Sequence, residues 1–326
     1  MGRETAVMDW EQMFPFLREK GHVVSLVGGG GKTTLLYALS AYCAAKGWRV
    51  LTSTTTHIRK PVNVPWIAAE EGEKIPEAET ATLPELESAN VSKKPWCEKK
   101  ICEDATYKKN ICEDSECKTY ASVKCVHEDA AWKNARKECD RLWQQGTYVV
   151  AGTPAPHEKL TILPEPIRNA WISDAEITFL EADGAKRLPC KFPAAHEPVI
   201  LPQSDIVLAV AGLSALYRPL GEVCFRWELA CEEWNRAMRE YREAAYQKEG
   251  KRLLKEVFIS KITPLTPEIL AWLLGNENGA RKDTAGRSFF VVLNQADTPE
   301  RRADGRKILD ILKQTYGIQG VLTSFS

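Results

Sequence analysis

The stretch SLVGGGGKTTLL, residues 25–36, places four consecutive glycines directly before a lysine and two threonines. An apolar run, HVVSLV (22–27), precedes the glycines, and an amphipathic helical pattern follows them and ends at Gly47. Strand, glycine turn, Lys-Thr and helix is the context in which a glycine motif predicts a phosphate-binding loop. Small residues let backbone N–H groups converge on phosphate oxygens, and the start of the helix adds partial positive charge.

We therefore expect this loop to bind the phosphates of ATP or GTP. The predicted nucleotide-binding residues are Gly28, Gly29, Gly30, Gly31, Lys32, Thr33 and Thr34. Lys32 would reach the β- and γ-phosphates, and Thr33 would be a ligand of Mg²⁺. The pattern G-x-x-x-x-G-K-[ST] requires a glycine at position 26, where this chain has Leu26. A plain glycine turn with a surface lysine is the alternative.

Apolar runs and helical patterns alternate along much of the chain. The predicted strands beyond the loop are 48–54, 147–152, 176–184, 205–212, 256–260 and 288–297, and the later predicted helices are 227–248, 266–275 and 299–316. Continuous apolar strands separated by helices predict a mostly parallel sheet that is covered on both faces. Together with the glycine loop, this pattern predicts a P-loop NTPase-like, three-layer α/β/α fold.

Residues 61–140 interrupt this alternation. We expect 1–60 and 141–326 to form one nucleotide-binding domain, with 61–140 as an insertion or subdomain rich in Cys, Lys and Glu. The cysteines of this region follow the pattern Cys97-x4-Cys102-x9-Cys112-x4-Cys117-x7-Cys125-x-His127. Because zinc sites use C-x2-C to C-x4-C pairs, Zn²⁺ is one interpretation. Thiol or selenium-related redox chemistry and simple tolerance of thiols are the others.

The stretch ITFLEADGAKR places two acids at the end of an apolar strand. Asp183 lies where a strand-end carboxylate of a phosphate-loop protein holds Mg²⁺, directly or through water. Glu181, two residues earlier, could position or deprotonate a water molecule. We therefore predict Lys32, Glu181 and Asp183 as catalytic residues, and Thr33 and Asp183 as metal-site residues. The alternative is that the acids only cap a strand end.

A second motif follows a late strand, in FFVVLNQAD. Asn294-Gln295-Ala296-Asp297 resembles the N-K-x-D signature of GTPases. In that signature the aspartate accepts hydrogen bonds from guanine, and the asparagine orders the loop and contacts the base. We therefore predict Asn294 and Asp297 as base contacts. Gln295 replaces the lysine, so ATP and GTP both stay open, and an ordinary strand-end turn is the alternative.

Two further segments carry candidate substrate residues. TSTTTHI (52–58) places hydroxyls and His57 at a strand end, although threonines also simply suit a strand. The loop behind the predicted metal-site acid carries Lys186, Arg187 and His196. A basic loop at this position could hold an anionic substrate or stabilise charge on a transferred phosphoryl group. Solvated surface lysines and arginines are the alternative.

Composition limits the partners and the location. Lys plus Arg and Asp plus Glu both number 44, so no basic field indicates nucleic acid. No apolar run approaches the ~18 residues of a membrane span. The start, MGRETAVMDWEQMF, lacks a signal-peptide pattern, so we expect a cytoplasmic protein.

Five motifs together resemble the YqeC family: SLVGGGGKTTL, RVLTSTTTHI, FLEADGAKRLPCKFPAAHEPVI, VAGLSALYRPLGE and VVLNQAD. The resemblance covers roughly 20–60 and 145–326. It implies an accessory protein of a selenium-dependent molybdenum hydroxylase, with that enzyme or its cofactor-maturation proteins as partners. It also implies that Lys32 and Thr33 belong to a nucleotide site, that Asp183 belongs to a magnesium site, and that Asn294 and Asp297 contact the base.

Three functions follow from these residues. The first is a Mg²⁺-dependent P-loop nucleoside triphosphatase that assists maturation of such a hydroxylase. The second is a small-molecule kinase whose acceptor is held by Lys186, Arg187 and His196. The third is a nucleotide-gated binding or carrier protein with little turnover. Analogy with P-loop folds adds a homodimer as an option.

Overall fold

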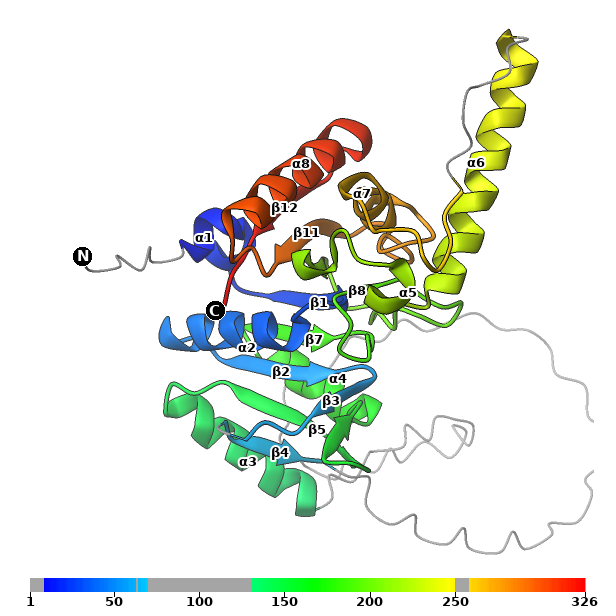
Figure 1. Cartoon of the computed structure of the whole chain (residues 1–326). Helices are drawn as coiled ribbons and strands as arrows, with labels where there is room; N and C mark the ends of the chain where they lie inside the picture. Colours follow the sequence, from blue (N-terminus) through cyan, green and yellow to red (C-terminus); the bar gives the residue numbers. More distant parts are fainter. Residues whose placement is uncertain (1–8, 63, 70–129, 250–257, 326) are drawn as a thin grey trace, which may run out of the picture. The chain divides into compact units, whose positions relative to one another are not determined.

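The computed structural model describes residues 9–62, 64–69, 130–249 and 258–325 (Figure 1). In these residues ten strands form one sheet in the order β12-β11-β9-β1-β7-β2-β5-β6-β3, with β4 paired to β5. The strands of this sheet are β1 (His22–Gly28), β2 (Val50–Thr54), β3 (His57–Arg59), β4 (Trp66–Ala68), β5 (Val149–Ala155), β6 (Lys159–Thr161), β7 (Ile177–Glu181), β9 (Ile206–Gly212), β11 (Ser288–Asn294) and β12 (Gln319–Leu322). A separate parallel pair consists of β8 (Cys190–Lys191) and β10 (Cys224–Phe225).

Helices connect most of the strands. They are α1 (Trp10–Met13), α2 (Lys32–Ala45), α3 (Ala130–Gln144), α4 (Glu165–Asp174), α5 (Leu220–Val223), α6 (Trp227–Glu249), α7 (Pro267–Gly275) and α8 (Pro299–Tyr316), with short 3-10 helices at Pro15–Arg18 and Leu213–Ala215. All the pairings from β12 to β5, and the pairing of β4 with β5, are parallel. The expected mixed α/β fold with a mostly parallel central sheet is therefore confirmed.

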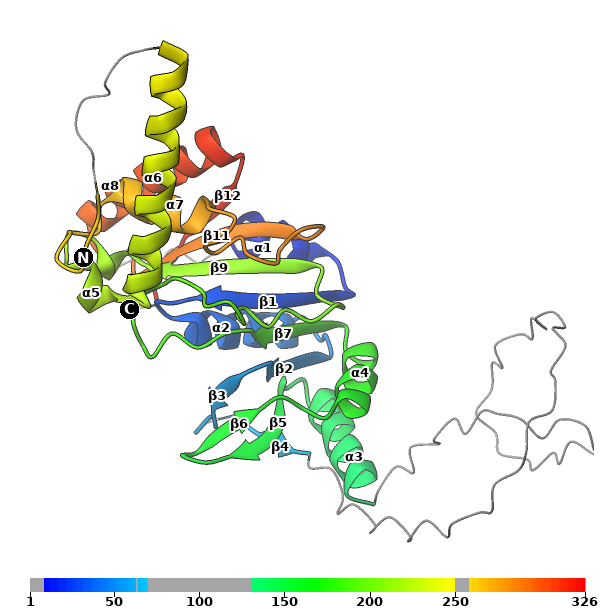
Figure 2. The same ribbon diagram turned by 90° about the vertical axis from the view of Figure 1, so that its right-hand side faces the viewer.

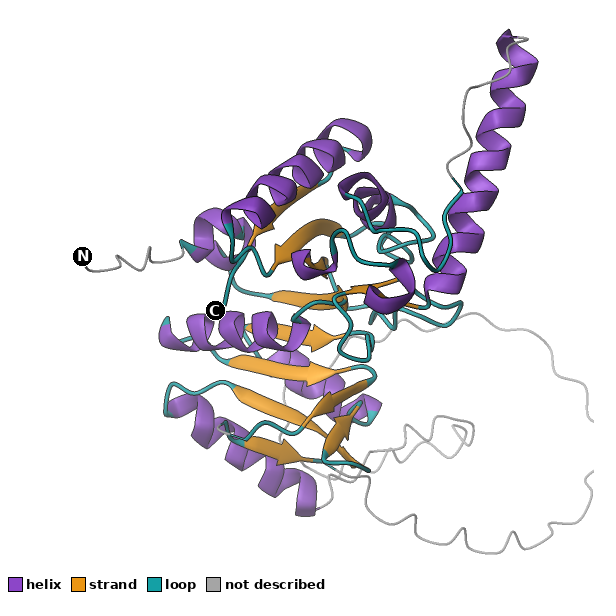
Figure 3. Ribbon diagram, in the orientation of Figure 1, coloured by secondary structure: helices purple, strands orange, loops and turns teal. Residues whose placement is uncertain are grey.

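The strands bury both of their faces. In β9, Leu208 and Val210 point into the core cluster that includes the leucines of α2, whereas Val207 and Ala209 point into the cluster that includes α7 and α8. Because successive side chains of a strand point to opposite faces, a strand covered on both sides must be apolar throughout. Figure 3 shows the helices on either side of the strands.

One end of the sheet is covered by α3 and α4, which pack on β2, β4 and β5 around Leu51, Leu142 and Trp171 (Figure 2). β4 lies inside the range 61–140 that we predicted as an insertion, and α3 begins inside it and ends at Gln144. They belong to the unit formed by residues 1–71 and 128–326. The cysteine pattern from Cys97 to His127, and with it the zinc prediction, lies outside the described residues.

Antiparallel strands end the sheet on the side of β5, and we call β6 with the second half of β5 and the adjoining β3 the hairpin. The second half of β5 pairs with β6, and β6 pairs in turn with β3, which follows directly after β2. His157 and Glu158 in the connecting turn have positive φ, 62° and 52°. The hairpin places the side chains of β3 and β6 beside the carboxyl ends of the parallel strands.

The strand predicted at 256–260 is wrong over its described part, because residues 258–260 have no regular structure. Ile259 is buried, but its N–H donates to the side chain of Asn235 in α6, and its carbonyl accepts from the same amide. A side chain thus takes both hydrogen bonds that a neighbouring strand would otherwise supply.

Parallel strands bring their carboxyl ends to one edge of the sheet. The segments after β1, β2, β7, β9 and β11 therefore meet there, and they include the glycine run, the threonine stretch, both predicted acids and the NQAD turn. This is the edge at which open α/β sheets bind ligands. In Figures 1 and 2 the later turns of α6 extend away from the sheet. None of the described helices combines the length and apolarity that crossing a membrane requires.

Candidate functional site

The glycine run forms a tight turn between β1 and α2. Gly28, Gly30 and Gly31 have φ values of 97°, 71° and 107°. A Cβ on Gly30 would lie 2.1 Å from the amide nitrogen of Gly212, because the loop packs directly on the end of β9. Glycine alone tolerates both the left-handed backbone and this close approach. Leu26, at the position of the missing motif glycine, stays inside β1 and is fully buried, so the turn begins only at Gly28.

Part of the loop's hydrogen-bonding capacity is used inside the protein. Gly29 N–H donates to the carbonyl of Val210 at 2.8 Å, and Gly30 N–H donates to that of Leu188 at 3.1 Å. The donors at the start of α2 differ, since the first N–H groups of a helix have no carbonyl one turn earlier. Its N-cap residue, Gly31, provides no side-chain cap. The backbone can therefore bind an anion at the first turn of α2.

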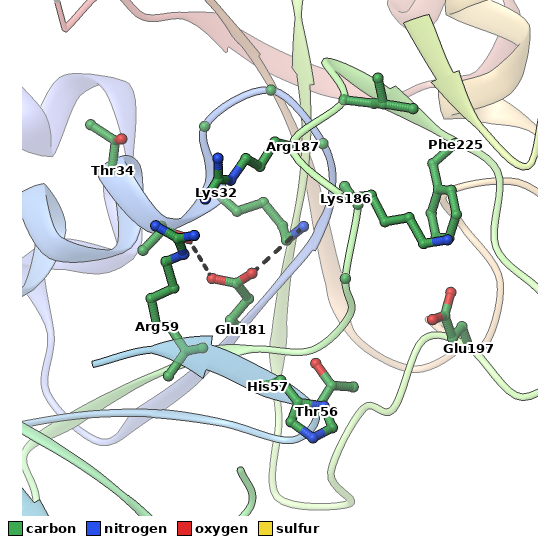
Figure 4. Close-up of a pocket in the computed structure, with 18 of the residues that line it drawn as sticks. Lys32, Thr34, Thr56, His57, Arg59, Glu181, Lys186, Arg187, Glu197 and Phe225 are labelled. Atoms are coloured by element: carbon green, nitrogen blue, oxygen red, sulfur yellow. Dashed lines mark hydrogen bonds and ion pairs between the residues drawn. The ribbon is translucent and has the colours of Figure 1, made fainter. Parts of the chain in front are cut away.

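Lys32 lies at the base of this turn and is only 4 % exposed. Its Nζ donates to the carbonyl oxygen of Gly28 at 2.5 Å and lies 3.0 Å from Oδ1 of Asp183. The ammonium group is also 3.9 Å from Oε1 of Glu181, the ion pair drawn in Figure 4. Lys32 is thus fixed where the turn and two carboxylates meet.

Thr33 and Glu181 form the second contact between loop and acids. The Thr33 hydroxyl donates to Oε2 of Glu181 at 2.7 Å. Burial raises the pKa of Glu181, and the nearby Lys32 ammonium and the Thr33 hydroxyl oppose that rise. A hydroxyl and a carboxylate oxygen side by side at the bottom of a pocket are the hard oxygen ligands that Mg²⁺ accepts. These two residues therefore fit a magnesium site.

Asp183, the predicted metal-site acid, is differently placed. Its carboxylate is 2 % exposed and accepts a hydrogen bond from Gly28 N–H. It lies between two ammonium groups, with Oδ1 3.0 Å from Lys32 and Oδ2 2.9 Å from Lys191. Of the two acids, Glu181 lines the large pocket described below, whereas Asp183 supports the loop from behind.

The ion pairs continue beyond Asp183 to the far side of the pocket. The Nζ of Lys191 is 2.5 Å from Oε2 of Glu197, and Arg226 donates twice to the same carboxylate. Burial favours the neutral form of Glu197, but hydrogen bonds from Arg226 and Lys191 outweigh it, so the pKa of Glu197 is lowered. We call Lys32, Asp183, Lys191, Glu197 and Arg226 the buried charge chain, in which positive and negative groups alternate.

A pocket of about 760 Å³ opens over the loop and the start of α2 (Figure 4). Its size is within the range of small-molecule sites, ~300–1,000 Å³. Its cationic lining residues are Lys32, Arg59, Lys159, Lys186, Arg187 and Arg226. Glu181 and Glu197 are its two carboxylates. The pocket therefore favours an anionic ligand.

The predicted substrate residues Lys186 and Arg187 occupy a strained turn. Both have positive φ, 48° and 64°, and Leu188 N–H donates to the carbonyl of Ala185 across them. Such a conformation costs a non-glycine residue about 1–3 kcal/mol. Figure 4 shows Arg187 directed toward the start of α2 and Lys186 toward Phe225, over whose ring its Nζ lies at 4.9 Å. We call residues 184–189 the strap.

The antiparallel hairpin faces the pocket from the opposite side. His57 and Arg59 lie on the same exposed face of β3, with the buried Ile58 between them. Arg59 stands directly opposite Lys159 of β6, so two cations form a cross-strand pair. Like charges at such positions destabilise a sheet. In Figure 4 the guanidinium group of Arg59 reaches toward Glu181 and the start of α2.

The end of β2 contributes hydroxyl groups. Thr54 donates to the carbonyl of Glu181 at 2.8 Å and thereby holds β2 against β7. Thr56 lines the pocket beside His57, and its buried Oγ1 has no hydrogen-bond partner among the described residues. A buried hydroxyl without a partner is costly, so Thr56 is suited to bind a ligand or a water molecule.

The NQAD turn touches the loop through its first residue. Asn294 donates from Nδ2 to the carbonyl of Gly30 at 2.9 Å, and its Oδ1 accepts from the Thr323 hydroxyl at 3.1 Å. Gln295, with φ of 63°, lines the pocket. Asp297 does not line it, and its carboxylate accepts a hydrogen bond from Ser324 at 2.6 Å. Asn294 therefore orders the loop, and its side chain is 4 % exposed.

The structure brings most predicted residues together and adds others. His57, Lys186 and Arg187 line the pocket, whereas His196 is exposed and is not one of the lining residues. The site residues that sequence reasoning missed are Arg59, Glu197, Phe225 and Arg226. Arg59 had a signal, the alternation His-Ile-Arg after the threonines. The other three are separated in sequence from the glycine run, and no local pattern marks them.

The described cysteines are not arranged for metal binding. Cys43, Cys139, Cys190, Cys224 and Cys231 are all buried, unpaired thiols. Across the described ranges, no group of three or more His, Cys, Asp or Glu side chains is positioned to hold a metal ion. The Thr33–Glu181 pair would rely on ligand phosphates and water for its remaining contacts, which is usual for Mg²⁺.

Fold and site together define a mixed α/β protein with a pocket lined by cationic side chains at the carboxyl edge of its sheet. The model of the YqeC protein family matches residues 24–228, and the chain belongs to that family. Those residues span the glycine loop, both acids, the strap and Arg226, but not the NQAD turn.

One relative comes from Escherichia coli strain K12 and is described as the uncharacterized protein YqeC. It is 27 % identical over 191 residues, which are 58 % of this chain and 51 % of the relative. The chain therefore spans about half the length of this relative. No solved structure matches significantly.

Proposed function

We propose that this protein is a P-loop nucleoside triphosphatase that binds Mg²⁺ with ATP or GTP in the 760 Å³ pocket. One observation carries the proposal. The uncapped start of α2, the ammonium group of Lys32 and the Thr33–Glu181 pair all meet on the floor of one cationic pocket. Backbone donors, a fixed lysine and hard oxygen ligands are the three components that phosphate-loop sites combine.

The residues at the floor of the pocket would have separate roles. The first N–H groups of α2 and Lys32 would bind the β- and γ-phosphates, and Thr33 with Glu181 would hold Mg²⁺. When bound, Mg²⁺ would neutralise charge on the phosphate oxygens. Asp183 keeps Lys32 and Gly28 in position rather than reaching the ligand.

The groups around the terminal phosphate support hydrolysis. Arg187 points from the strap to the start of α2, where it would stabilise charge that develops on the transferred phosphoryl group (Figure 4). Thr56, whose hydroxyl has no hydrogen-bond partner among the described residues, would orient the attacking water. The strain in the strap turn is consistent with a functional position, where strained backbone tends to occur.

Base selection would depend on the residues of the NQAD turn. Gln295 lines the pocket, Asn294 is engaged with the loop, and Asp297 bonds Ser324 outside the lining. We propose that Gln295 lies against the purine and that Asp297 selects guanine by exchanging its Ser324 contact for the base. If it does, Asp297→Ala abolishes the preference for GTP over ATP.

Isothermal titration with ATP and GTP, with and without Mg²⁺, tests nucleotide binding. We expect Mg²⁺-dependent binding that Lys32→Ala weakens at least 100-fold, with phosphate release lost in parallel. Lys133→Ala, which removes an exposed lysine of α3, is the matched control and should change neither. Because Lys32 is buried, Thr33→Val serves as the second variant, and it should abolish the effect of Mg²⁺. The proposal fails if neither nucleotide binds to the wild-type protein.

We further propose that this activity assists the maturation of a selenium-dependent molybdenum hydroxylase in the cytoplasm. This part rests on the family resemblance and its motifs, not on the chemistry of the pocket. It predicts that cells carrying Lys32→Ala assemble an inactive hydroxylase, while Lys133→Ala restores full activity. Equal hydroxylase activity in both strains would refute the role.

A further inference from the structure

The cationic side chains of the pocket differ in whether a neighbouring group balances their charge. Lys32 contacts Asp183, Arg226 contacts Glu197, and the Nζ of Lys186 lies over the ring of Phe225. For three other lining residues we find neither an ion pair nor a side-chain hydrogen bond in the part of the chain that the structure describes. They are Arg59, Lys159 and Arg187. These side chains hold cationic charge that no neighbouring described group balances.

The charge of a nucleotide does not account for the whole lining. Six cationic and two anionic side chains leave the pocket with an excess of four positive charges. The remaining pair behind it, Asp183 with Lys191, cancels. A nucleoside triphosphate with Mg²⁺ carries about two net negative charges at neutral pH. About two positive charges are therefore left after the nucleotide binds.

The remaining positive charge lies on the hairpin. Arg59 and Lys159 stand opposite each other on β3 and β6, an arrangement that destabilises the sheet unless an anion lies between or above them. His57, on the same face of β3, adds a further donor. The guanidinium group of Arg59 reaches toward the start of α2, so a ligand on this hairpin would lie beside the terminal phosphate (Figure 4).

We propose that Arg59, Lys159 and His57 bind a second small ligand with about two negative charges, next to the terminal phosphate of the nucleotide. A phosphate monoester and a dicarboxylate share the required chemistry. The proposal rests on nucleotide binding at the glycine loop and adds a second substrate class to the same pocket. Lys159 contacts only the second ligand, whereas Arg59 lies between the two ligands.

Titration of inorganic phosphate into protein saturated with Mg²⁺ and a non-hydrolysable nucleotide analogue tests this site. Because the analogue fills the loop, we expect one further equivalent of phosphate to bind. Lys159→Gln should weaken it at least fivefold while nucleotide affinity changes less than twofold. Lys133→Gln, with the same charge removed from α3, should leave both affinities unchanged. A parallel titration with malonate distinguishes dicarboxylates from phosphate.

Two results would overturn the proposal. One is that phosphate no longer binds once the nucleotide analogue is present, which would mean a single anion site. The other is equal phosphate affinity in wild type and Lys159→Gln. If no nucleotide binds at all, the proposed triphosphatase fails on its own. Phosphate titration of the ligand-free protein then still tests the second site. Loss of phosphate binding in Lys159→Gln supports a site on β3 and β6, whereas loss of binding only in Lys32→Ala assigns the phosphate to the glycine loop.

Discussion

In the buried charge chain each charged group contacts one of opposite sign, whereas Arg59 and Lys159 place two cations opposite each other in the antiparallel pair of β3 and β6. The difference follows exposure. Lys191 is 1 % exposed at its side chain, where an unpaired charge would be very costly, and Arg59 is solvated. The buried charges of the chain are therefore paired, whereas the unpaired cations lie where water screens their charge. Substitutions on the two sides should therefore have opposite consequences for stability and binding.

Removal of Lys191 should have the largest effect. Lys191→Met would leave Asp183 and Glu197 buried without the ammonium group that lies between them. Breaking a buried ion pair from one side costs about 3–5 kcal/mol, so we expect a fall in melting temperature of roughly 10 °C. Thermal unfolding followed by circular dichroism measures it. Lys159→Met, the matched change on β6, removes one of two like charges that face each other, so stability should stay the same or rise slightly.

A smaller loss of stability is expected when the hydrogen bond between Asn294 of β11 and the glycine loop is removed. Asn294→Ala would leave the carbonyl of Gly30 and the hydroxyl of Thr323 without their buried partner, at a cost of about 1–3 kcal/mol. Because the loop is then less ordered, nucleotide affinity should fall as well. Urea unfolding and nucleotide titration check both effects. A variant that loses stability but keeps full affinity would show that Asn294 does not position the loop.

The next effect concerns pH. The pKa of Glu181 is raised above its ordinary 4.5 by burial, so the folded state holds this proton more tightly than the unfolded state. Its ionisation therefore lowers stability as pH rises from 4.5 to the raised folded value. In Glu181→Gln that slope should disappear, stability at neutral pH should rise slightly, and Mg²⁺ affinity in the presence of nucleotide should fall about tenfold.

Glu197 provides an internal contrast, because Arg226 and Lys191 lower its pKa against the effect of burial. Its contribution to stability is present above 4.5 and is lost as pH falls through the lowered folded value. Unfolding measured between pH 3 and pH 8 separates the two acids. If Glu181→Gln keeps the wild-type slope above pH 4.5, the raised pKa belongs to another group.

The sequence was informative wherever local periodicity and a short motif coincide. The apolar run before the glycines, the helix after them and the acids at the end of β7 could all be predicted, because each depends on residues close in the chain. The buried charge chain could not, because Lys191 meets Asp183 and Glu197 only through the strap and the turn before β9. Arg59 was missed because the His-Ile-Arg alternation of β3 covers only three residues, which is too few to separate a strand from a loop.

The boundaries of the predicted insertion illustrate the same limit. Trp66–Ala68 is only three residues long and Ala130–Gln144 is rich in charged residues, yet they pack on β5 with Ile67, Cys139 and Trp143 buried. Their burial depends on a sheet edge that local sequence does not reveal. The role of Asp183 was likewise beyond local reasoning, since its carboxylate lies between Lys32 of α2 and Lys191 of β8.

The smallest expected effect reverses the usual direction of a site substitution. Lys159→Glu would replace the like-charged cross-strand pair with an opposite pair facing Arg59, which stabilises a sheet by about 0.2–1 kcal/mol. The variant should therefore melt slightly above the wild type at low salt while it loses the second anion. The gain should shrink as salt screens the pair. If the pair serves only the fold, Lys159→Glu gains stability at no cost in phosphate binding. If the pair instead serves a ligand, Lys159→Glu should gain stability and lose phosphate binding together.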